Sequence, residues 1–393
     1  MTQPRYSLEE IRLRLNELDD QLLNILSERR SLSIQVAKSK VETSKPVRDP
    51  KREQELLVKL INNGKEKYQL DATYITKLFH TIIEDSVLLQ QAYLQNLANP
   101  QQSRKPLARV AFLGAKGSYS HLASREYFSR KNTELIELNC GQFKEVVSTV
   151  ESGHADFGVL PIENTSSGSI NEVYDLLQHT TLYIVGELTL PIDHCLLAPQ
   201  DMRLEDIKTL YSHPQPHQQC SEFLSHLNSV TLESCASTAD AMQKVKDFKR
   251  TDVAAIGNAS SGKLYGLQII KENISNQTEN HTRFIVVARK PVEVSTQIPA
   301  KTTLIMSTSQ EAGSLVQTLL VLQHYGINMT KLESRPIMGN PWEEMFYVDL
   351  EAHLDSQEMQ QAIIELTKIT RHLKVLGCYP IENIKPTHVK LES

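Results

Sequence analysis

The sequence predicts three modules of different fold classes: an all-α module, an α/β module and a small α+β module. Residues 1–98 contain few glycines and repeat apolar residues every three or four positions, which is the period of a helix. Between residues 108 and 290, short β-rich runs alternate with helical segments, as in α/β domains. Residues 301–393 give the order strand, helix, strand, strand, helix, strand, which predicts a ferredoxin-like sandwich.

Two polar, proline-containing stretches are expected to separate these modules. The first linker covers residues 99–107 and contains two prolines, at Pro100 and Pro106. The second covers residues 291–300, around Pro291 and Pro299. A chain of 393 residues has room for two or three domains, so this division suits its length.

Composition and charge indicate a cytoplasmic protein without a nucleic-acid or membrane partner. The net charge is −5, and no apolar run is long enough to span a bilayer. The N-terminus is charged almost from its start and lacks the apolar stretch of a signal peptide. The five cysteines are scattered, with no CxxC pair, so we expect reduced thiols and no metal site.

The first helix, from about residue 7 to residue 40, is predicted to present one apolar stripe. Two cations, Arg29 and Lys40, interrupt it. A cation on a buried face needs an anionic partner. A single one could extend to the surface instead, but two on one stripe, three turns apart, indicate a bound anion. The apolar members of the stripe are Leu8, Ile11, Leu15, Leu18, Leu22, Ile25, Leu32 and Val36.

The length of this helix predicts a second copy of the chain. At ~1.5 Å per residue it measures roughly 50 Å, whereas a domain of this size is only about 30–35 Å across. The helix therefore extends beyond its own domain, and we expect an intertwined helical dimer. Arg12 lies ~25 Å along the axis from Arg29, too far for one small ligand. If Arg12 serves a site of this kind, it serves the site of the partner subunit.

Two further helices are expected to complete the all-α module. Asp49 and Pro50 suit the N-cap and first position of the second helix, which is predicted to end near residues 62–64. The third helix places Ser86 and Gln90 on its apolar face. These two residues could form core hydrogen bonds, or they could contact the same anion.

These helices resemble the all-helical chorismate mutase domain. The resemblance rests on Arg12, Glu28-Arg-Arg30, Lys40, Pro46-Val-Arg-Asp49, Arg52-Glu53 and Ile83-Glu-Asp-Ser-Val-Leu-Leu-Gln90. It implies that Arg29 and Arg12 of the partner subunit hold the two carboxylates of chorismate, and that Lys40 and Gln90 donate to its ether oxygen. It also implies that Ser86 contacts a carboxylate, that Glu53 and Asp49 position the substrate hydroxyl and the loop, and that Arg52 binds substrate. A pericyclic rearrangement needs no nucleophile, metal or cofactor, only a held conformer and stabilised charge.

Three polar clusters mark the α/β module. Gly114-Ala-Lys-Gly-Ser-Tyr-Ser-His121 follows a strand and opens a helix, so it is either a carboxylate cradle or an ordinary turn. Pro161-Ile-Glu-Asn-Thr-Ser-Ser-Gly168 is either a cleft site at a strand end or a capping loop. Thr282-Arg-Phe284 begins a strand. His213 and His217 have helical spacing, but Pro214 and Pro216 predict a loop there and no metal site.

Together with Tyr211-Ser-His-Pro-Gln-Pro-His-Gln-Gln-Cys220, these clusters resemble prephenate dehydratase. The resemblance implies two α/β lobes with a cleft between them, closing to expel water. One departure is Ala115, where the family usually has proline. Prephenate would lose carbon dioxide and water to give phenylpyruvate. The residues expected to bind it are Asn164, Thr165, Ser166, Gln219, Arg283 and Phe284.

The dehydratase reaction needs a proton for the departing hydroxyl. By resemblance, Thr282 is expected to act on this hydroxyl, but a threonine hydroxyl is too weak an acid to be the final proton source. We therefore expect Thr282 to orient or relay the proton. Glu163, or water held by Glu163, Asn164 and Gln219, would supply it, with the pKa of the carboxyl raised. Arg283, or backbone groups near residues 166–168, would hold the pyruvyl carboxylate.

The last module resembles an ACT regulatory domain through Gly313-Ser-Leu315 and Glu333-Ser-Arg-Pro336. The resemblance implies feedback inhibition by phenylalanine bound at a subunit interface, with Gly313, Ser314, Leu315, Glu333, Ser334 and Arg335 at the site. Ser314 stands where alanine is common. A structural domain that only dimerises is the alternative.

The whole chain is thus expected to be a bifunctional mutase–dehydratase of phenylalanine biosynthesis. It would bind chorismate, prephenate and phenylalanine, and form a homodimer or higher homo-oligomer. A two-lobed amino-acid sensor without catalysis is the competing hypothesis. A mutase fused to a dehydrogenase is disfavoured, because no dinucleotide-binding loop is present.

Overall fold

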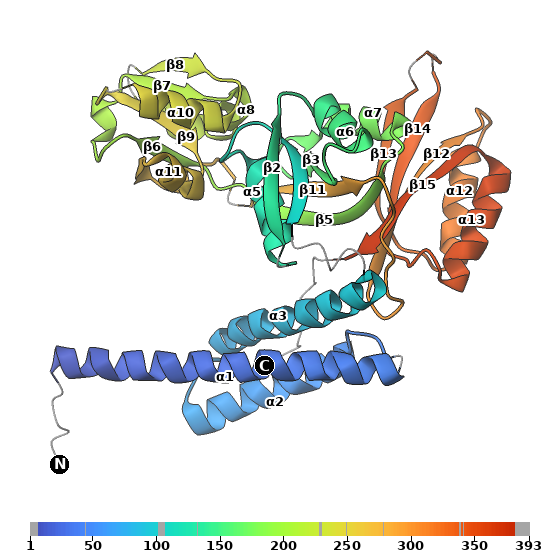
Figure 1. Ribbon diagram of the computed structural model, residues 1–393, viewed down its shortest axis with the longest axis horizontal. Coiled ribbons are helices and arrows are strands. Elements are labelled where there is room, and N and C mark those ends of the chain that lie inside the picture. The colour runs from blue at the N-terminus through green and yellow to red at the C-terminus, as the bar shows by residue number, and fades with distance from the viewer. Residues whose placement is uncertain are drawn as a thin grey trace. The chain divides into compact units, whose positions relative to one another are not determined.

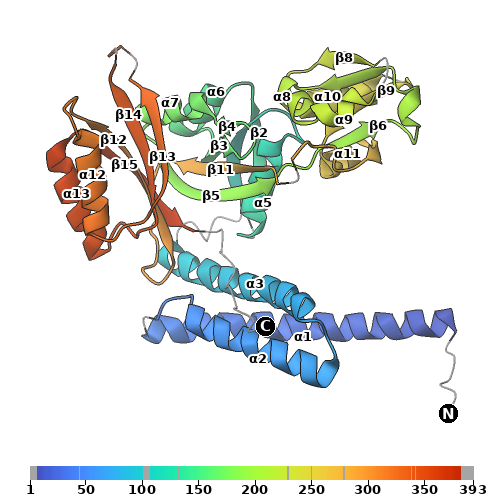
Figure 2. The same ribbon diagram turned by 180° about the vertical axis from the view of Figure 1, so that it is seen from behind.

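The computed structural model describes residues 7–43, 45–100, 107–131, 133–227, 230–248, 250–277, 279–337, 339–340 and 342–381. The chain forms two compact units (Figure 1, Figure 2). The first contains the described residues up to Pro100 together with Val294–Pro299. The second contains the described residues from Leu107 to Glu293 and from Ala300 to Ile381. Among the described residues, no helix is long and apolar enough to cross a membrane.

The first unit is built from helices α1 (Leu8–Thr43), α2 (Pro50–Tyr68) and α3 (Ala72–Ala98). The predicted start of the second helix is confirmed, since the Asp49 carboxylate caps α2 by accepting from the Arg52 backbone N–H at 3.0 Å. Its predicted end is wrong, because α2 continues past residues 62–64. Gly64 lies inside α2 against Ile75 of α3, where any side chain would collide, so this glycine allows close helix packing instead of ending the helix.

Helix α1 has 36 residues and therefore measures ~54 Å. It packs beside α3 along its C-terminal half, where Ser33 and Ala37 are buried. The apolar side chains of its N-terminal half, among them Ile11, Leu15 and Leu22, are exposed in the single chain.

The second unit contains two α/β lobes. The sheet of the first lobe has the order β2-β1-β3-β11-β5, and β4 adds to the edge of β3. Strands β1, β2 and β3 are parallel, whereas β11 runs antiparallel between β3 and β5. The elements of this lobe are β1 (Leu107–Leu113), α5 (Tyr119–Ser129), β2 (Glu134–Cys140), α6 (Phe143–Glu151), β3 (Phe157–Asn164), β4 (Gly168–Ser169), α7 (Asn171–His179), β5 (Tyr183–Pro191) and β11 (His281–Ala288).

The second lobe has a sheet of order β10-β6-β9-β7-β8. Its strands and helices are β6 (Cys195–Ala198), the 3-10 helix η1 (Leu204–Asp206), β7 (Thr209–Ser212), α8 (Pro214–Gln219), α9 (Ser221–Ser225), β8 (Thr231–Ser234), α10 (Thr238–Asp247), β9 (Val253–Gly257), α11 (Ala259–Tyr265) and β10 (Gln268–Lys271). The prediction of a loop around His213 is wrong, since α8 begins at Pro214. Both prolines lie in the first turn, where backbone N–H groups have no partner within a helix.

The third sheet has the order β13-β14-β12-β15, which confirms the predicted ferredoxin-like arrangement. Its helices cover one face, and its other face packs on the first lobe (Figure 1). Gly377 lies so close to the Ile184 carbonyl that a side chain there would collide with backbone. The elements are β12 (Ala300–Thr308), α12 (Ser314–His324), β13 (Met329–Pro336), β14 (Glu344–Leu350), α13 (Gln357–Ile369) and β15 (Thr370–Pro380).

Candidate active sites

The helical unit brings Arg29, Ser86 and Gln90 together between α1 and α3. The Arg29 guanidinium donates to the Ser86 hydroxyl and, at 3.1 Å, to the Ile82 carbonyl. Burial lowers the pKa of Arg29, while nearby Asp85 opposes that shift. Gln90 is buried and donates to the Ser86 carbonyl at 3.1 Å. Within the described part of the chain its Oε1 finds no hydrogen-bond partner, so only the nitrogen end of this amide is held by the protein.

A second group forms where α1 ends and α2 begins. The Lys40 ammonium donates to the Val47 carbonyl at 2.5 Å. Arg48 forms an ion pair of 2.7 Å with the buried Glu53. Burial lowers the pKa of Lys40, and the charges of Asp49 and Glu53 partly oppose this. Lys40, Asp49 and Glu53 therefore lie near one another, as the sequence predicts.

Arg12 and Arg52 belong to neither group. Both are exposed, and Arg52 pairs loosely with Glu55 at 3.9 Å. Arg12 lies in the N-terminal half of α1, 17 residues and ~25 Å before Arg29.

In the first lobe, the side chain of Asn164 is the centre of a polar network. Its Nδ2 donates to Thr282 Oγ1 at 2.9 Å and to Asn280 Oδ1 at 2.8 Å. Its Oδ1 accepts from the backbone N–H groups of Ser166 at 3.0 Å and Ser167 at 2.9 Å. Asn164 and Thr282 are cross-strand neighbours on β3 and β11, and both are buried.

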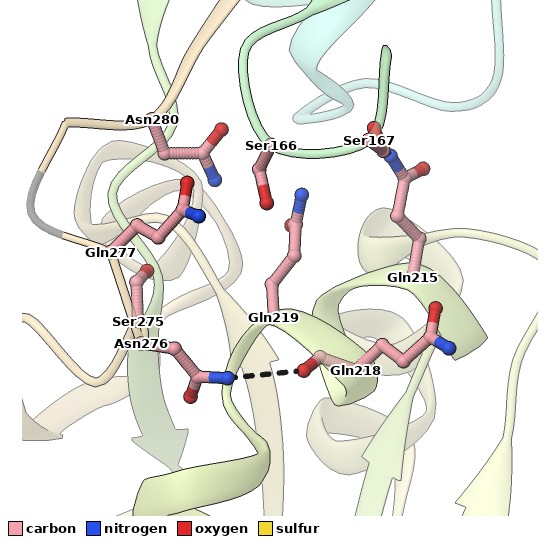
Figure 3. A pocket seen from close by; sticks show the side chains of 9 residues that line it. All are labelled: Ser166, Ser167, Gln215, Gln218, Gln219, Ser275, Asn276, Gln277 and Asn280. Atoms are coloured by element: carbon pink, nitrogen blue, oxygen red, sulfur yellow. Dashed lines mark hydrogen bonds between the residues drawn. The ribbon is translucent and has the colours of Figure 1, made fainter.

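This network lies at a polar cavity of about 360 Å³, a volume suited to a small molecule (Figure 3). Gln219 extends from α8 toward Ser166, and its Nε2 lies 3.4 Å from Asn164 Oδ1. The first lobe supplies Ser166 and Ser167, and the second supplies the glutamines of α8. The lining residues are Ser166, Ser167, Gln215, Gln218, Gln219, Ser275, Asn276, Gln277 and Asn280.

A buried histidine, His194, orients Gln219, and no sequence motif predicts this contact. His194 Nε2 lies 2.8 Å from Gln219 Oε1, and its Nδ1 lies 3.3 Å from the hydroxyl of Tyr119. Burial lowers the pKa of His194, so the ring is neutral near pH 7. Because an amide oxygen only accepts, Nε2 carries the proton, and the amide nitrogen of Gln219 faces Asn164. Neither His194 nor Tyr119 lies near Gln219 in sequence, so only the fold brings them together.

Comparison with known proteins identifies the families of two modules. The family model described as chorismate mutase type II matches residues 11–91, and the model described as prephenate dehydratase matches residues 110–292. The bifunctional chorismate mutase/prephenate dehydratase of Enterobacter agglomerans is 55% identical over 384 residues, covering 98% of each chain. The chain belongs to this bifunctional family.

Solved structures share the fold of the dehydratase module and the ACT-like sheet. The prephenate dehydratase of Arthrobacter aurescens, in complex with L-Phe, is 25% identical with a TM-score of 0.64, covering 72% of this chain and 93% of that one. GqqA, a quorum-quenching acylase, is 30% identical with a TM-score of 0.62, covering 69% of this chain and 97% of that one. Since one fold can host different chemistry, the reaction must be argued from the site residues.

In the dehydratase module, strand alternation separates the predicted site residues. Neighbours in a strand point to opposite faces. Thr282 lies on the side of β11 that bears Asn164, while Arg283 faces the third sheet. Phe284, beyond a register shift after Arg283, is buried in the core of the first lobe. The structure therefore brings neither Arg283 nor Phe284 to the cavity, and their contact with substrate stays a prediction. Thr165 joins two strand ends, because its Oγ1 accepts from the His281 N–H at 2.9 Å.

Arg283 is instead the centre of a buried ion network between β11 and the third sheet. Its guanidinium lies 2.6 Å from Asp349, 2.8 Å from Glu187 and 3.1 Å from Glu163. Burial alone would lower the pKa of Arg283, but Tyr379 and the three carboxylates raise it, so the group stays charged.

The prediction of a raised pKa for Glu163 is wrong. Burial acts to raise the pKa of this carboxyl, but Lys331, at 2.8 Å, and Arg283 lower it below its ordinary value. An ionised carboxylate held by two cations on the face away from Thr282 is not a proton donor for the cavity.

The predicted residues of the ACT-like sheet also divide between two faces. Glu333 accepts from Ser169 at 2.6 Å, and Arg335 forms a bidentate pair with Asp175 at 2.9 Å, so both contact the dehydratase module. Ser334 alternates with them and lies on the helix-covered face. Gly313, with a φ of 85°, begins α12 on that same face, and the Ser314 hydroxyl lies 2.7 Å from that of Ser309.

Proposed function

We propose that this chain catalyses two successive reactions. The helical module rearranges chorismate to prephenate, and the dehydratase module converts prephenate to phenylpyruvate, carbon dioxide and water. The observation that supports this most directly is the Asn164–Thr282 pair, because hydrogen-bond partners of Asn164 line a polar cavity in one module. In another module, the cations Arg29 and Lys40 share one face of α1.

The mutase step relies on fixed charge. Arg29 binds a carboxylate of chorismate and is backed by Ser86, which accepts its hydrogen bond. Lys40 and Gln90 donate to the ether oxygen, where negative charge grows as the carbon–oxygen bond breaks. Burial strengthens these interactions, because the surrounding dielectric is low. Glu53, held by Arg48, faces the substrate hydroxyl, and the capping Asp49 fixes the loop before α2.

The dehydratase step relies on Thr282 held by Asn164. Because Asn164 Nδ2 donates to Thr282 Oγ1, the threonine proton is free to point at the departing hydroxyl. The carbon–carbon bond to the ring carboxylate breaks and releases carbon dioxide, and its electron pair moves through the ring as the carbon–oxygen bond of the hydroxyl breaks. Thr282 relays a proton from solvent water to the departing oxygen, which leaves as water. The side chains of Ser166, Gln218 and Gln219 line the cavity and are neutral groups that can donate hydrogen bonds. Glu163 and Arg283 support this pair from behind.

We also propose that the protein works as a homodimer and is regulated by phenylalanine. The exposed apolar face of α1 is buried against a second copy, which brings Arg12 of the partner subunit to the site of Arg29. Phenylalanine binds beside Gly313, Ser314, Leu315 and Ser334 on the helix-covered side of the ACT-like sheet. The L-Phe complex of the Arthrobacter relative supports this ligand.

One assay on the full chain tests the two activities. Chorismate is supplied, and prephenate and phenylpyruvate are followed with and without phenylalanine. Lys40→Ala should abolish only the first step, and Thr282→Val only the second, while Thr282→Ser keeps the hydroxyl and much of the activity. Loss of both steps in either single variant, with the fold intact, would contradict two separate sites. A chain that binds phenylalanine but converts neither substrate would instead be an amino-acid sensor.

A further inference from the structure

The segment Val294–Pro299 connects β11 of the dehydratase module to β12 of the ACT-like sheet, yet it belongs to the helical unit. Ile298 is buried in one apolar cluster with Val47, Val87 and Leu94. The sequence predicts this stretch to be a linker. Its burial indicates that it is instead a fixed part of the mutase module, which we call the strap.

Gln297 makes the polar contacts of the strap. Its side-chain Nε2 donates to the carbonyls of Lys40 and Lys45, each at 2.7 Å. Its own carbonyl accepts from the Val47 N–H at 2.9 Å. Lys40 lies in the last turn of α1, where backbone carbonyls lack partners within the helix. One side chain from a distant part of the sequence therefore caps the end of α1 and fixes the loop that follows.

This loop is the one that holds the mutase cation. Val47, whose N–H is bound by the Gln297 carbonyl, presents its own carbonyl to the Lys40 ammonium at 2.5 Å. The next residue, Arg48, pairs with Glu53 at 2.7 Å. Gln297 thus contacts the backbone on both sides of the turn that brings Lys40 and Glu53 together, without touching either side chain.

We infer that Gln297 is a positioning residue for Lys40, so that a segment from outside the three helices completes the mutase site. The inference rests on the role of Lys40 in the proposed mutase step. Its chemical requirement is specific: the carbonyls of Lys40 and Lys45 both accept from one side-chain nitrogen, and a side chain of the same length without a donor cannot bridge them.

The test uses the full chain and compares three substitutions. Gln297→Met keeps the length and apolar stem but removes the donor. Gln297→Lys restores a nitrogen donor beside helix-terminal carbonyls, where positive charge is also favourable. Thr296→Ala is the matched control, because Thr296 lies in the same strap with an exposed side chain. Mutase and dehydratase kinetics are measured on each purified chain, together with the thermal unfolding midpoint.

Gln297→Met should lower the mutase kcat by about 10- to 100-fold, as expected for a small displacement of a catalytic group. The KM for chorismate should change far less, because Arg29 is not contacted by the strap. Gln297→Lys should recover most of the lost kcat, and Thr296→Ala should match the unsubstituted chain. Dehydratase kinetics on supplied prephenate should stay the same in all three.

Three results would overturn the inference: an unchanged mutase kcat in Gln297→Met, a parallel loss of both activities, or no recovery in Gln297→Lys despite a normal unfolding midpoint. Failure of the proposed function is distinguishable, because the unsubstituted chain would then show no mutase activity at all.

Discussion

At the scale of single residues, neighbours in the chain serve different parts of the molecule. Thr282 contacts Asn164 beside the cavity, whereas Arg283 contacts Asp349 and Glu187 on the opposite face of β11. The same alternation separates Asn164 from Glu163 on β3. Each polar motif therefore contains residues that face the site and residues that pack against other elements. A motif match alone does not distinguish the two kinds.

Glu163 should affect stability, not proton supply. Its pKa in the folded chain is lowered, so its ionisation stabilises the fold above the unfolded value of about 4.3 and ceases to do so as the pH falls through the folded pKa. Thermal unfolding between pH 3 and pH 7 should show Glu163→Gln less stable than the unsubstituted chain near neutrality, with the difference shrinking in acid. Its dehydratase pH–rate profile should keep the acidic limb. Loss of that limb would restore the proton-donor role.

Lys40 should set the alkaline limit of the mutase. Burial lowers the pKa of Lys40, and Asp49 and Glu53 only partly compensate, so the ammonium loses its proton below the ordinary lysine value of about 10.4. The mutase kcat should therefore fall as pH rises through that lowered pKa. Lys40→Gln should be weakly active with no such fall. Dehydratase activity of the same samples shows whether the chain remains folded, and an identical alkaline limb in Lys40→Gln would contradict the assignment.

At the scale of elements, β11 joins the dehydratase sheet to the ACT-like sheet. The guanidinium of Arg283 lies among three carboxylates, and Lys301 binds Glu187 at 2.7 Å on the same side. This network lies on the opposite face of β3 and β11 from Asn164 and Thr282, the pair proposed to act on prephenate. A change in the ACT-like sheet therefore has a short physical route to the cavity, through Lys331 and Glu163.

Replacing Arg283 should lower the free energy of unfolding far more than replacing Arg335, whose partner is more exposed. Arg283→Met leaves buried carboxylates without their cation and should destabilise the chain by about 3–5 kcal/mol. Arg335→Met is the matched control, since its partner Asp175 is partly exposed and such pairs contribute about 0–1 kcal/mol. Denaturant unfolding of both variants measures the difference. Equal losses of unfolding free energy in the two variants would show that the buried network contributes no more to stability than the more exposed pair.

At the scale of the whole molecule, the proposed mutase site draws on more than one chain. Arg12 lies ~25 Å from Arg29 on a helix whose N-terminal apolar face is exposed in the single chain. A symmetric dimer would bury this face twice and supply Arg12 to each partner.

Mixing two inactive variants tests this sharing. Arg12→Ala and Lys40→Ala each remove a residue from every site of their own dimers. After unfolding and refolding together, half of the dimers should be mixed and hold one intact site, giving about a quarter of the unsubstituted mutase rate. Each variant refolded alone is the control. No recovery in a mixture that forms dimers by light scattering would place Arg12 in the site of its own chain.

The order of the modules and the cap of α2 could be predicted from the sequence alone, as could the placement of Arg29 and Lys40 on one helix face. These features are local, because Asp49 caps its own helix and Arg29 and Lys40 are set on one face by the helical period. The predicted end of α2 is wrong, because Gly64 allows close packing against Ile75 and does not end the helix.

Only the tertiary structure decided which side chains share a site. Thr282 and Arg283 lie on opposite faces of one strand, and His194 contacts Gln219. Gln297 of the strap binds the backbone at the turn after Lys40. These pairings depend on strand register and long-range packing, which residue spacing does not encode. The physical reason is the same in each case: a buried polar group must find a partner, and the fold supplies it from wherever the chain passes.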